Sequence, residues 1–220
     1  MLTQTGGPNP GTAGPVGPNP GEDCRDPLPA NGKFSPGGMF QNYITVLKCG
    51  DTWRINYSIY YVHDGAGSEG HRHDWESATV VLRQDPGGKD MWHRDSLVLS
   101  FHDTWHSKSW KDIQTVNMDG DLRDTTVGKL KMHPKVYVGF FKHAGFFEAK
   151  TDVEVYSAGS KGDEYRSDDW FFMGDMNKNN FVQATKLDKF HDDYEGKFAP
   201  YYFRHKKDED AETLCTLPLP

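Results

Sequence analysis

The densest group of chemically versatile side chains in the chain is a heptapeptide at residues 70–76. It reads Gly70-His71-Arg72-His73-Asp74-Trp75-Glu76. Another carboxylate, Asp64, stands seven residues before His71, and the loop between them is rich in glycine. Carboxylate oxygens are the ligands that Mg²⁺, Ca²⁺ and Mn²⁺ prefer. A loop that returns Asp64 towards Asp74 and Glu76 therefore predicts a site for a hard divalent cation.

The histidines in this stretch leave other interpretations open. His71 and His73 would suit zinc, which prefers nitrogen and sulfur ligands in a closed tetrahedron. On an ideal strand these two histidines point to one face. Asp74 and Glu76 then point to the other face, so a turn at Gly70 is needed for the candidate ligands to converge. Alternatively, the heptapeptide binds no metal and forms a buried network of ion pairs that fixes a loop to a sheet.

The segments on either side of this loop are predicted to be strands that position the site. Apolar side chains occupy every second position before the loop, at Trp53, Ile55, Tyr57, Ile59 and Tyr61. This period of two is typical of a half-buried strand. Residues 77–82, Ser-Ala-Thr-Val-Val-Leu, continue the heptapeptide as a second strand. Together they predict a hairpin with the candidate cation site at its tip.

The heptapeptide matches, residue for residue, the signature of the necrosis- and ethylene-inducing-peptide-like proteins. These are secreted microbial cytolysins that act on plants. Residues 133–139, His-Pro-Lys-Val-Tyr-Val-Gly, resemble a later strand of that family, and Lys142-His143-Ala144 resembles the loop that follows it. Residues 166–170 resemble a further family segment. The chain is therefore identified as resembling a divergent member of this family over residues 24–215.

The resemblance implies a mainly β fold, a β-sandwich with a few peripheral helices, similar to actinoporins and fungal lectins. It implies a binding protein and not an enzyme, because family members bind sphingolipid headgroups of the plant plasma membrane and then disrupt the bilayer. The lipid is glycosyl inositol phosphorylceramide or a related glycan, and a divalent cation, Mg²⁺ or Ca²⁺, lies in an acidic cavity beside the heptapeptide. Carried over by position, Asp64 and Asp74 ligate the ion directly. His71 and Glu76 reach it directly or through water.

Aromatic and basic side chains are predicted to touch the lipid headgroup or the membrane: Trp105, His106, Trp110 and His143. Tryptophan suits the bilayer interface because it joins an apolar ring to a polar N–H group. The alternative for each tryptophan is packing inside the sandwich. The alternative for each histidine is a structural hydrogen bond.

The chain departs from the family pattern at several positions. Residues 56–60 read Asn-Tyr-Ser-Ile-Tyr, where many plant-toxic members have methionine-tyrosine-serine-tryptophan-tyrosine. Ser107 and Lys108 stand where the family tends to have two glycines, which changes the freedom of the backbone. Lys142 replaces an acid that cytolytic members often carry, and Asp64 lies one residue closer to the heptapeptide than expected.

These departures leave three functional hypotheses. The first is a cation-dependent, sphingolipid-binding cytolysin. The second is a non-cytotoxic family member that binds a glycan or lipid, or that plants recognise. The third is a metal-dependent hydrolase in which Glu76 is the general base for a metal-activated water.

Composition limits the classes of function further. The chain has 220 residues and 24.9 kDa, which fits a single domain at 24–220. Residues 1–23 repeat Gly-Pro-Asn-Pro-Gly in a tract that is predicted to be a disordered arm. The net charge of −7 argues against a nucleic-acid partner. No secretory signal is recognisable in the sequence, so the resemblance implies a mature secreted form with an added start methionine. We expect a monomer in solution that acts at the outer face of the plant plasma membrane.

The chain has three cysteines, Cys24, Cys49 and Cys215. An odd number leaves one free thiol or a bond to another chain. The resemblance favours a disulfide between Cys24 and Cys49, because the family has two cysteines in its N-terminal region; closing that loop would stabilise the fold by about 3 kcal/mol. Cys49 with Cys215 is the alternative. Either disulfide agrees with secretion.

Overall fold

The computed structural model describes the chain at residues 42–64, 71–88, 90–101, 104–117, 119–121, 124–138, 143–148, 150–151, 162–163, 181–183 and 214–220. Side chains are described in these segments except at residues 60–64 and 71–74 and in the three short strands between residues 150 and 183. The predicted arm at residues 1–23 lies outside the described residues, and so does Cys24.

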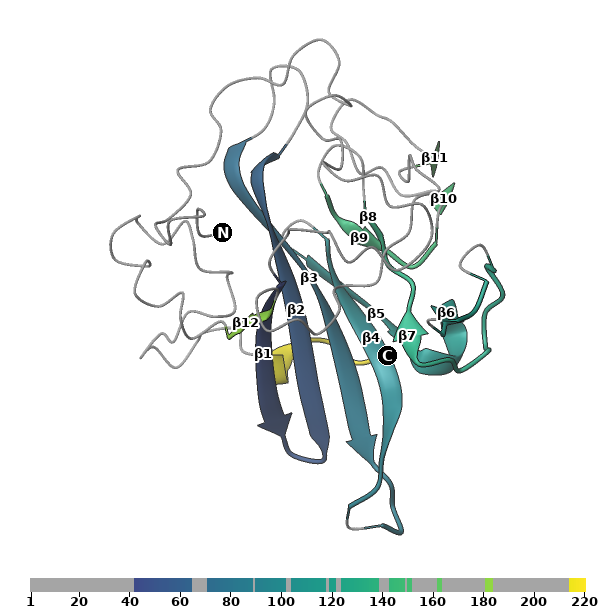
Figure 1. Cartoon of the computed structure of the whole chain (residues 1–220). Coiled ribbons are helices and arrows are strands. Elements are labelled where there is room, and N and C mark those ends of the chain that lie inside the picture. The colour runs from purple at the N-terminus through teal and green to yellow at the C-terminus, as the bar shows by residue number, and fades with distance from the viewer. Residues whose placement is uncertain are drawn as a thin grey trace, which may run out of the picture.

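One large sheet organises the described part of the chain (Figure 1). Five strands follow one another as an antiparallel meander: β1 Asn42–Cys49, β2 Thr52–Asp64, β3 His71–Gln84, β4 Trp92–Phe101 and β5 Thr104–Ser109. A sixth strand, β12 Phe181–Gln183, pairs parallel to β1 and makes the spatial order β12-β1-β2-β3-β4-β5. The two strands predicted around the glycine-rich loop are thus confirmed as β2 and β3.

The first hairpin depends on a glycine. Cys49 pairs with Thr52, so only Gly50 and Asp51 form the turn between β1 and β2. Gly50 has a φ of +62°, which a residue with a Cβ atom rarely adopts. The Thr52 hydroxyl donates to the Cys49 carbonyl at 2.8 Å and closes the turn.

Small elements complete the fold. Three two-stranded ribbons pair β6 Thr115–Val116 with β7 His133–Pro134, β8 Tyr137–Val138 with β9 Gly145–Phe146, and β10 Lys150–Thr151 with β11 Gly162–Asp163. The helices described are single 3-10 turns, η1 Trp110–Asp112 and η4 Leu214–Thr216. Within the described residues no helix has the length and apolar character needed to cross a bilayer. The predicted mainly β fold is confirmed.

Strand β4, which lies between β3 and β5, is covered on both faces. Leu97, Val98 and Leu99 are all fully buried, although consecutive strand residues point to opposite faces. Leu97 and Leu99 pack with Trp110 and Ile113, which lie in and after η1. Val98 packs with Val81 and with two leucines of the C-terminal segment, Leu214 and Leu217. Figure 1 shows that segment, in yellow, lying against β1 and β2.

Burial along β2 is the reverse of what its hydrophobic pattern predicts. Its polar residues Arg54, Asn56 and Ser58 are buried. The apolar residues that alternate with them at positions 53, 55, 57 and 59 are only half-buried. Buried polar groups are tolerated when they are hydrogen-bonded. The Asn56 amide donates to the Thr79 hydroxyl at 2.8 Å, and the Ser58 hydroxyl donates to Asn56 Oδ1 at 2.7 Å. Hydrogen bonds among these buried side chains therefore take the place of hydrogen bonds to water on this face of the sheet.

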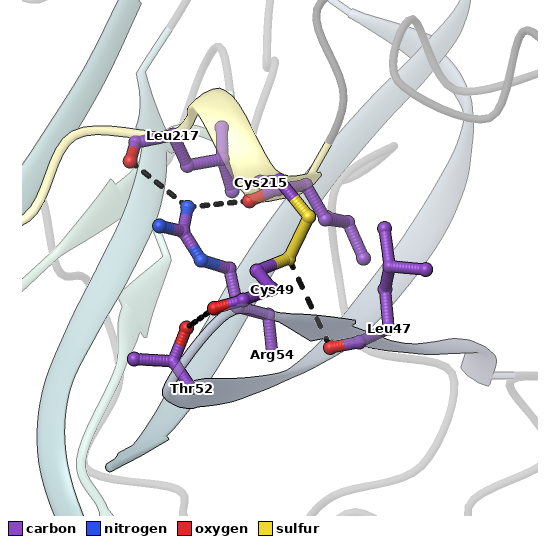
Figure 2. Close-up of a disulfide and its surroundings, with 7 residues drawn as sticks. Leu47, Cys49, Thr52, Arg54, Cys215 and Leu217 are labelled. Carbon is purple, nitrogen blue, oxygen red and sulfur yellow. Dashed lines mark hydrogen bonds between the residues drawn. A yellow bond between two sulfur atoms is a disulfide. The ribbon is translucent and has the colours of Figure 1, made fainter.

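The disulfide joins Cys49 to Cys215, with 5.3 Å between their Cα atoms (Figure 2). The predicted bond between Cys24 and Cys49 is therefore wrong, and the alternative pairing is the one found. The physical reason lies in the C-terminal segment, which docks where β1 turns into β2. The buried Arg54 guanidinium donates hydrogen bonds to the carbonyls of Leu214 and Leu217, the latter at 2.9 Å. Figure 2 shows the bond to Leu217 beside the disulfide. Cys215 is thereby brought to Cys49.

Candidate functional site

The tip of the β2–β3 hairpin carries the heptapeptide. The two strands pair in constant register from Thr52 opposite Arg83 to Asp64 opposite His71. Asp74 pairs with Tyr61, three positions farther from the tip. The predicted hairpin is confirmed, and so is the start of a strand within the heptapeptide. The loop at residues 65–70, including Gly70, lies outside the described residues.

The structure places three of the four predicted ligands by backbone alone. Asp64 and His71 are cross-strand partners at the tip, and Asp74 lies on the same strand as His71. The side chains of these residues are outside the description. Their role as cation ligands stays a prediction, and so does that of Arg72 and His73 in an ion-pair network.

Trp75 fixes the heptapeptide to the sheet. Its ring meets Tyr43 of β1 edge to face, with 5.1 Å between the ring centroids. Tyr43 is fully buried, and aromatic pairs in this geometry stabilise by about 0.5–1.5 kcal/mol beyond their buried area. The contact reaches across β2, so it ties three strands together just below the tip.

Glu76, the last residue of the heptapeptide, is held by the neighbouring strand β4. Its side chain is only 8% exposed, and its Oε2 accepts a hydrogen bond from the Ser100 hydroxyl. Ser100 Oγ in turn accepts from the backbone N–H of Ser77 at 2.6 Å. Glu76 is thus a buried carboxylate with a fixed hydrogen-bond donor at the base of the predicted site.

Strand β5 presents two of the residues predicted to touch lipid. Trp105 is half-buried against the Val81–Val98 cluster, which fits the packing alternative. His106 is exposed, and its ring lies 4.8 Å from that of Phe101 between centroids. His106 remains accessible from solvent, and its predicted contact with a headgroup stays a prediction.

The other two predicted contacts are buried. Trp110 is 3% exposed and belongs to the core with Leu97 and Leu99. Its indole N–H donates to the Lys131 carbonyl at 3.2 Å. His143 is 7% exposed and has a φ of +53°. The burial of both side chains favours the packing and structural alternatives, and their predicted contact with lipid stays a prediction.

Burial also perturbs titration beside the sheet. Burial lowers the pKa of His133 on β7, and the positive charge of Arg94 lowers it further. Burial raises the pKa of Tyr137 to about 12, with a contribution from Glu148. The Tyr137 hydroxyl donates to Gln114 Oε1 at 2.6 Å. Both groups are therefore held in their neutral forms near neutral pH.

Comparison with known families decides the membership of the chain. Residues 15–188 match the family described as "Necrosis inducing protein (NPP1)". The chain belongs to this family. The predicted resemblance, built on the heptapeptide, is confirmed.

Similarity of this necrosis-inducing protein family member to solved structures is low. "Necrosis and Ethylene inducing Protein 2 from the causal agent of cocoa's Witches Broom disease" is 19% identical, with 63% of this chain and 72% of that chain aligned at a TM-score of 0.37. The "non-toxic HaNLP3 protein" is 19% identical, with 72% and 67% aligned at a TM-score of 0.31. "NLPPya in complex with mannosamine" is 17% identical, with 65% and 50% aligned at a TM-score of 0.34. The chain thus spans half the length of that NLPPya chain. No curated protein matches it.

The donor set of this family member suits a hard cation better than zinc. Asp64, Asp74 and Glu76 offer three carboxylates, the oxygen ligands that Mg²⁺ and Ca²⁺ prefer, whereas the single imidazole of His71 is a ligand more typical of zinc and other transition metals. Among the described side chains no three His, Cys, Asp or Glu gather as a metal site, but that set includes only Glu76 of these four. The residues present fit the implied ion by chemical type.

Ser100 was not singled out from the sequence. The only signal is that it ends the buried run Leu97-Val98-Leu99 with a polar residue, six residues before His106. A serine at the end of a buried strand is ordinary, because its hydroxyl can bond to nearby backbone. Its link to Glu76 depends on the register of β3 against β4, which sequence alone does not supply.

Proposed function

We propose that this member of the necrosis-inducing protein family is a secreted protein that binds sphingolipid headgroups of the plant plasma membrane with the help of a divalent cation. Binding is followed by disruption of the bilayer, without turnover of a substrate. The observation that carries the proposal is the intact heptapeptide at the tip of the β2–β3 hairpin, whose second half is fixed to the sheet through Trp75 and Glu76.

The cation has a clear physical task in this proposal. The net charge of −7 gives the protein no general attraction to an anionic membrane surface. A bound Mg²⁺ or Ca²⁺ supplies local positive charge and open coordination positions for oxygen ligands. Phosphate and sugar hydroxyl oxygens of a headgroup are such ligands. Asp64, Asp74, His71 and Glu76 would hold the ion, and the headgroup would complete its coordination.

The hairpin supplies the rigidity that the site needs. Trp75 packs on Tyr43, and Glu76 bonds to Ser100, so the second half of the heptapeptide is fixed to β1 and β4. A site on strands is held more accurately than one on a free loop. His106 on β5 is the exposed side chain that we propose to contact the headgroup beside the ion.

Leakage of dye from vesicles that contain glycosyl inositol phosphorylceramide tests this function. Asp74→Ala and Glu76→Ala should abolish leakage while the circular dichroism spectrum stays that of the wild type. Asp90→Ala is the matched control, because Asp90 is an exposed acid in the β3–β4 turn at the opposite end of the sheet (Figure 1). Leakage that persists in the Asp74 and Glu76 variants at the wild-type rate would reject the proposal.

One observation favours a second candidate, a non-cytotoxic glycan or lipid binder. Ser107 and Lys108 lie within strand β5 and pair with Val98 and Leu97 of β4. The family tends to have two glycines there, which would leave the backbone freer. A stiffer segment beside His106 would retain headgroup binding and lose a conformational step of membrane disruption. Flotation with the same vesicles separates the candidates, because the binder would float with them and release no dye.

A further inference from the structure

We infer that Ser100 is a positioning residue for Glu76, so that the cation site is built by three strands and not by the β2–β3 hairpin alone. This inference rests on the proposed function, since it assigns Ser100 a role towards the proposed ion. Ser100 lies on β4 and contacts the end of the heptapeptide from outside it.

The hydrogen bonds of Ser100 leave its hydroxyl little freedom. Its oxygen accepts from the Ser77 backbone N–H at 2.6 Å, which fixes one lone pair. Its single hydrogen has two acceptors in reach, Glu76 Oε2 and the Ser77 carbonyl at 3.2 Å. The carboxylate is the stronger acceptor, because hydrogen bonds to ionised groups are shorter and stronger than those to neutral ones. The hydroxyl is therefore directed at Glu76.

The surroundings make this contact rigid. Ser100 is 5% exposed and directly follows the fully buried Leu99. The pairing of β3 with β4 ends at Ala78 opposite Leu99, so Ser100 is the first residue of β4 beyond the ladder. Beyond the end of the ladder, the Ser100 hydroxyl connects β4 to Glu76 by a side-chain hydrogen bond. The hydroxyl thus holds one oxygen of the Glu76 carboxylate, Oε2, in a fixed position.

Outer residues that orient metal ligands have a measurable effect on affinity. Removing such a partner typically weakens metal binding about 10- to 100-fold. We expect Ser100→Ala to weaken binding of Ca²⁺ or Mg²⁺ about tenfold. Ser100→Thr keeps the hydroxyl, so its affinity for the ion should stay within about twofold of the wild-type affinity. This result is expected because the hydroxyl is the group that holds Glu76 in position.

Ser96→Ala is the matched control. Ser96 lies on the same strand, is 0% exposed, and donates its hydroxyl to Asp95 Oδ2 at 3.1 Å, away from the heptapeptide. The two alanine variants remove the same group from equally buried positions of β4. They should therefore lose similar stability in chelator, and only Ser100→Ala should lose ion affinity.

Calorimetric titration of the whole chain with Ca²⁺ and with Mg²⁺, without lipid, is the deciding experiment. The rise in unfolding temperature on adding the same ions is the second readout, and it remains measurable in a destabilised variant. Weaker ion binding in Ser100→Ala with normal binding in Ser96→Ala and Ser100→Thr would support the inference. Equal binding in all variants would overturn it and leave the proposed function standing. A wild type that binds neither ion would overturn both.

Discussion

The disulfide between Cys49 and Cys215 has a predictable effect on the free energy of unfolding. Measuring that effect tests which cysteines are paired and whether the C-terminal segment docks on the sheet. The two cysteines are 166 residues apart, so the bond closes most of the chain into one loop. For a loop of this size the chain-entropy relation gives a stabilisation of about 5 kcal/mol at 25 °C. Native domains have a total stability of about 5–15 kcal/mol, so loss of the bond removes a large part of it.

Cys215→Ser should therefore lower the free energy of unfolding by several kcal/mol, measured by urea denaturation under oxidising conditions. Cys24→Ser is the control, because it removes the cysteine that the observed disulfide does not use. It should unfold as the wild type does. Reductant should destabilise the wild type by a similar amount and leave Cys215→Ser unchanged.

The opposite result would refute this reasoning. If Cys24→Ser unfolds early and Cys215→Ser unfolds normally, the stabilising bond is the one between Cys24 and Cys49. Mapping the disulfide-linked peptides without reduction would then show the same pair. The apolar contacts of Leu214 and Leu217 with Val81 and Val98 would then have to hold the C-terminal segment on the sheet without a covalent bond.

Other predictions concern the core and its charges. Arg54→Met leaves two buried carbonyls of the C-terminal segment without their donor and should cost about 2–3 kcal/mol in urea denaturation; a cost near zero would contradict the hydrogen bonds seen. Trp110→Ala removes a core ring and should lower the free energy of unfolding by about 3–5 kcal/mol. His106→Ala changes an exposed position and should lower it by less than about 0.5 kcal/mol. Equal losses in the two variants would refute the burial of Trp110. The pKa of His133 is lowered from 6.5 in the fold, so the unfolded chain takes up the proton first. The contribution of His133 to stability should be complete above pH 6.5 and should decrease as the pH falls from 6.5 towards the pKa of the folded protein. His133→Asn should make stability less dependent on pH in this range. An unchanged pH dependence in that variant would contradict the lowered pKa of His133.

The sequence predicted the elements whose signals are local. The alternation around Tyr57 was enough to place β2, and the run after Glu76 was enough to place β3. The short glycine-rich loop between the two strands predicted that they pair as a hairpin. The heptapeptide is a contiguous signature, so it was sufficient to predict the family of the chain.

Features that depend on distant parts of the chain were missed. The partner of Cys49 is set by the docking of a segment 166 residues away, which three cysteine positions cannot reveal. The sequence leaves open whether Trp110 touches the membrane or packs inside the fold, because its burial depends on the direction in which η1 leaves β5. The alternation in β2 predicts an exposed polar face, but Asn56 is buried there, because its hydrogen bond to Thr79 satisfies its amide.

The proposed function depends most on a shared cation at the hairpin tip. A crystal structure of the protein grown with saturating Ca²⁺ or Mg²⁺ tests this directly. We predict one ion bound by oxygens of Asp64 and Asp74, at about 2.3–2.6 Å for Ca²⁺. Two carboxylates turned away from each other under those conditions, with no ion between them, would contradict the proposal.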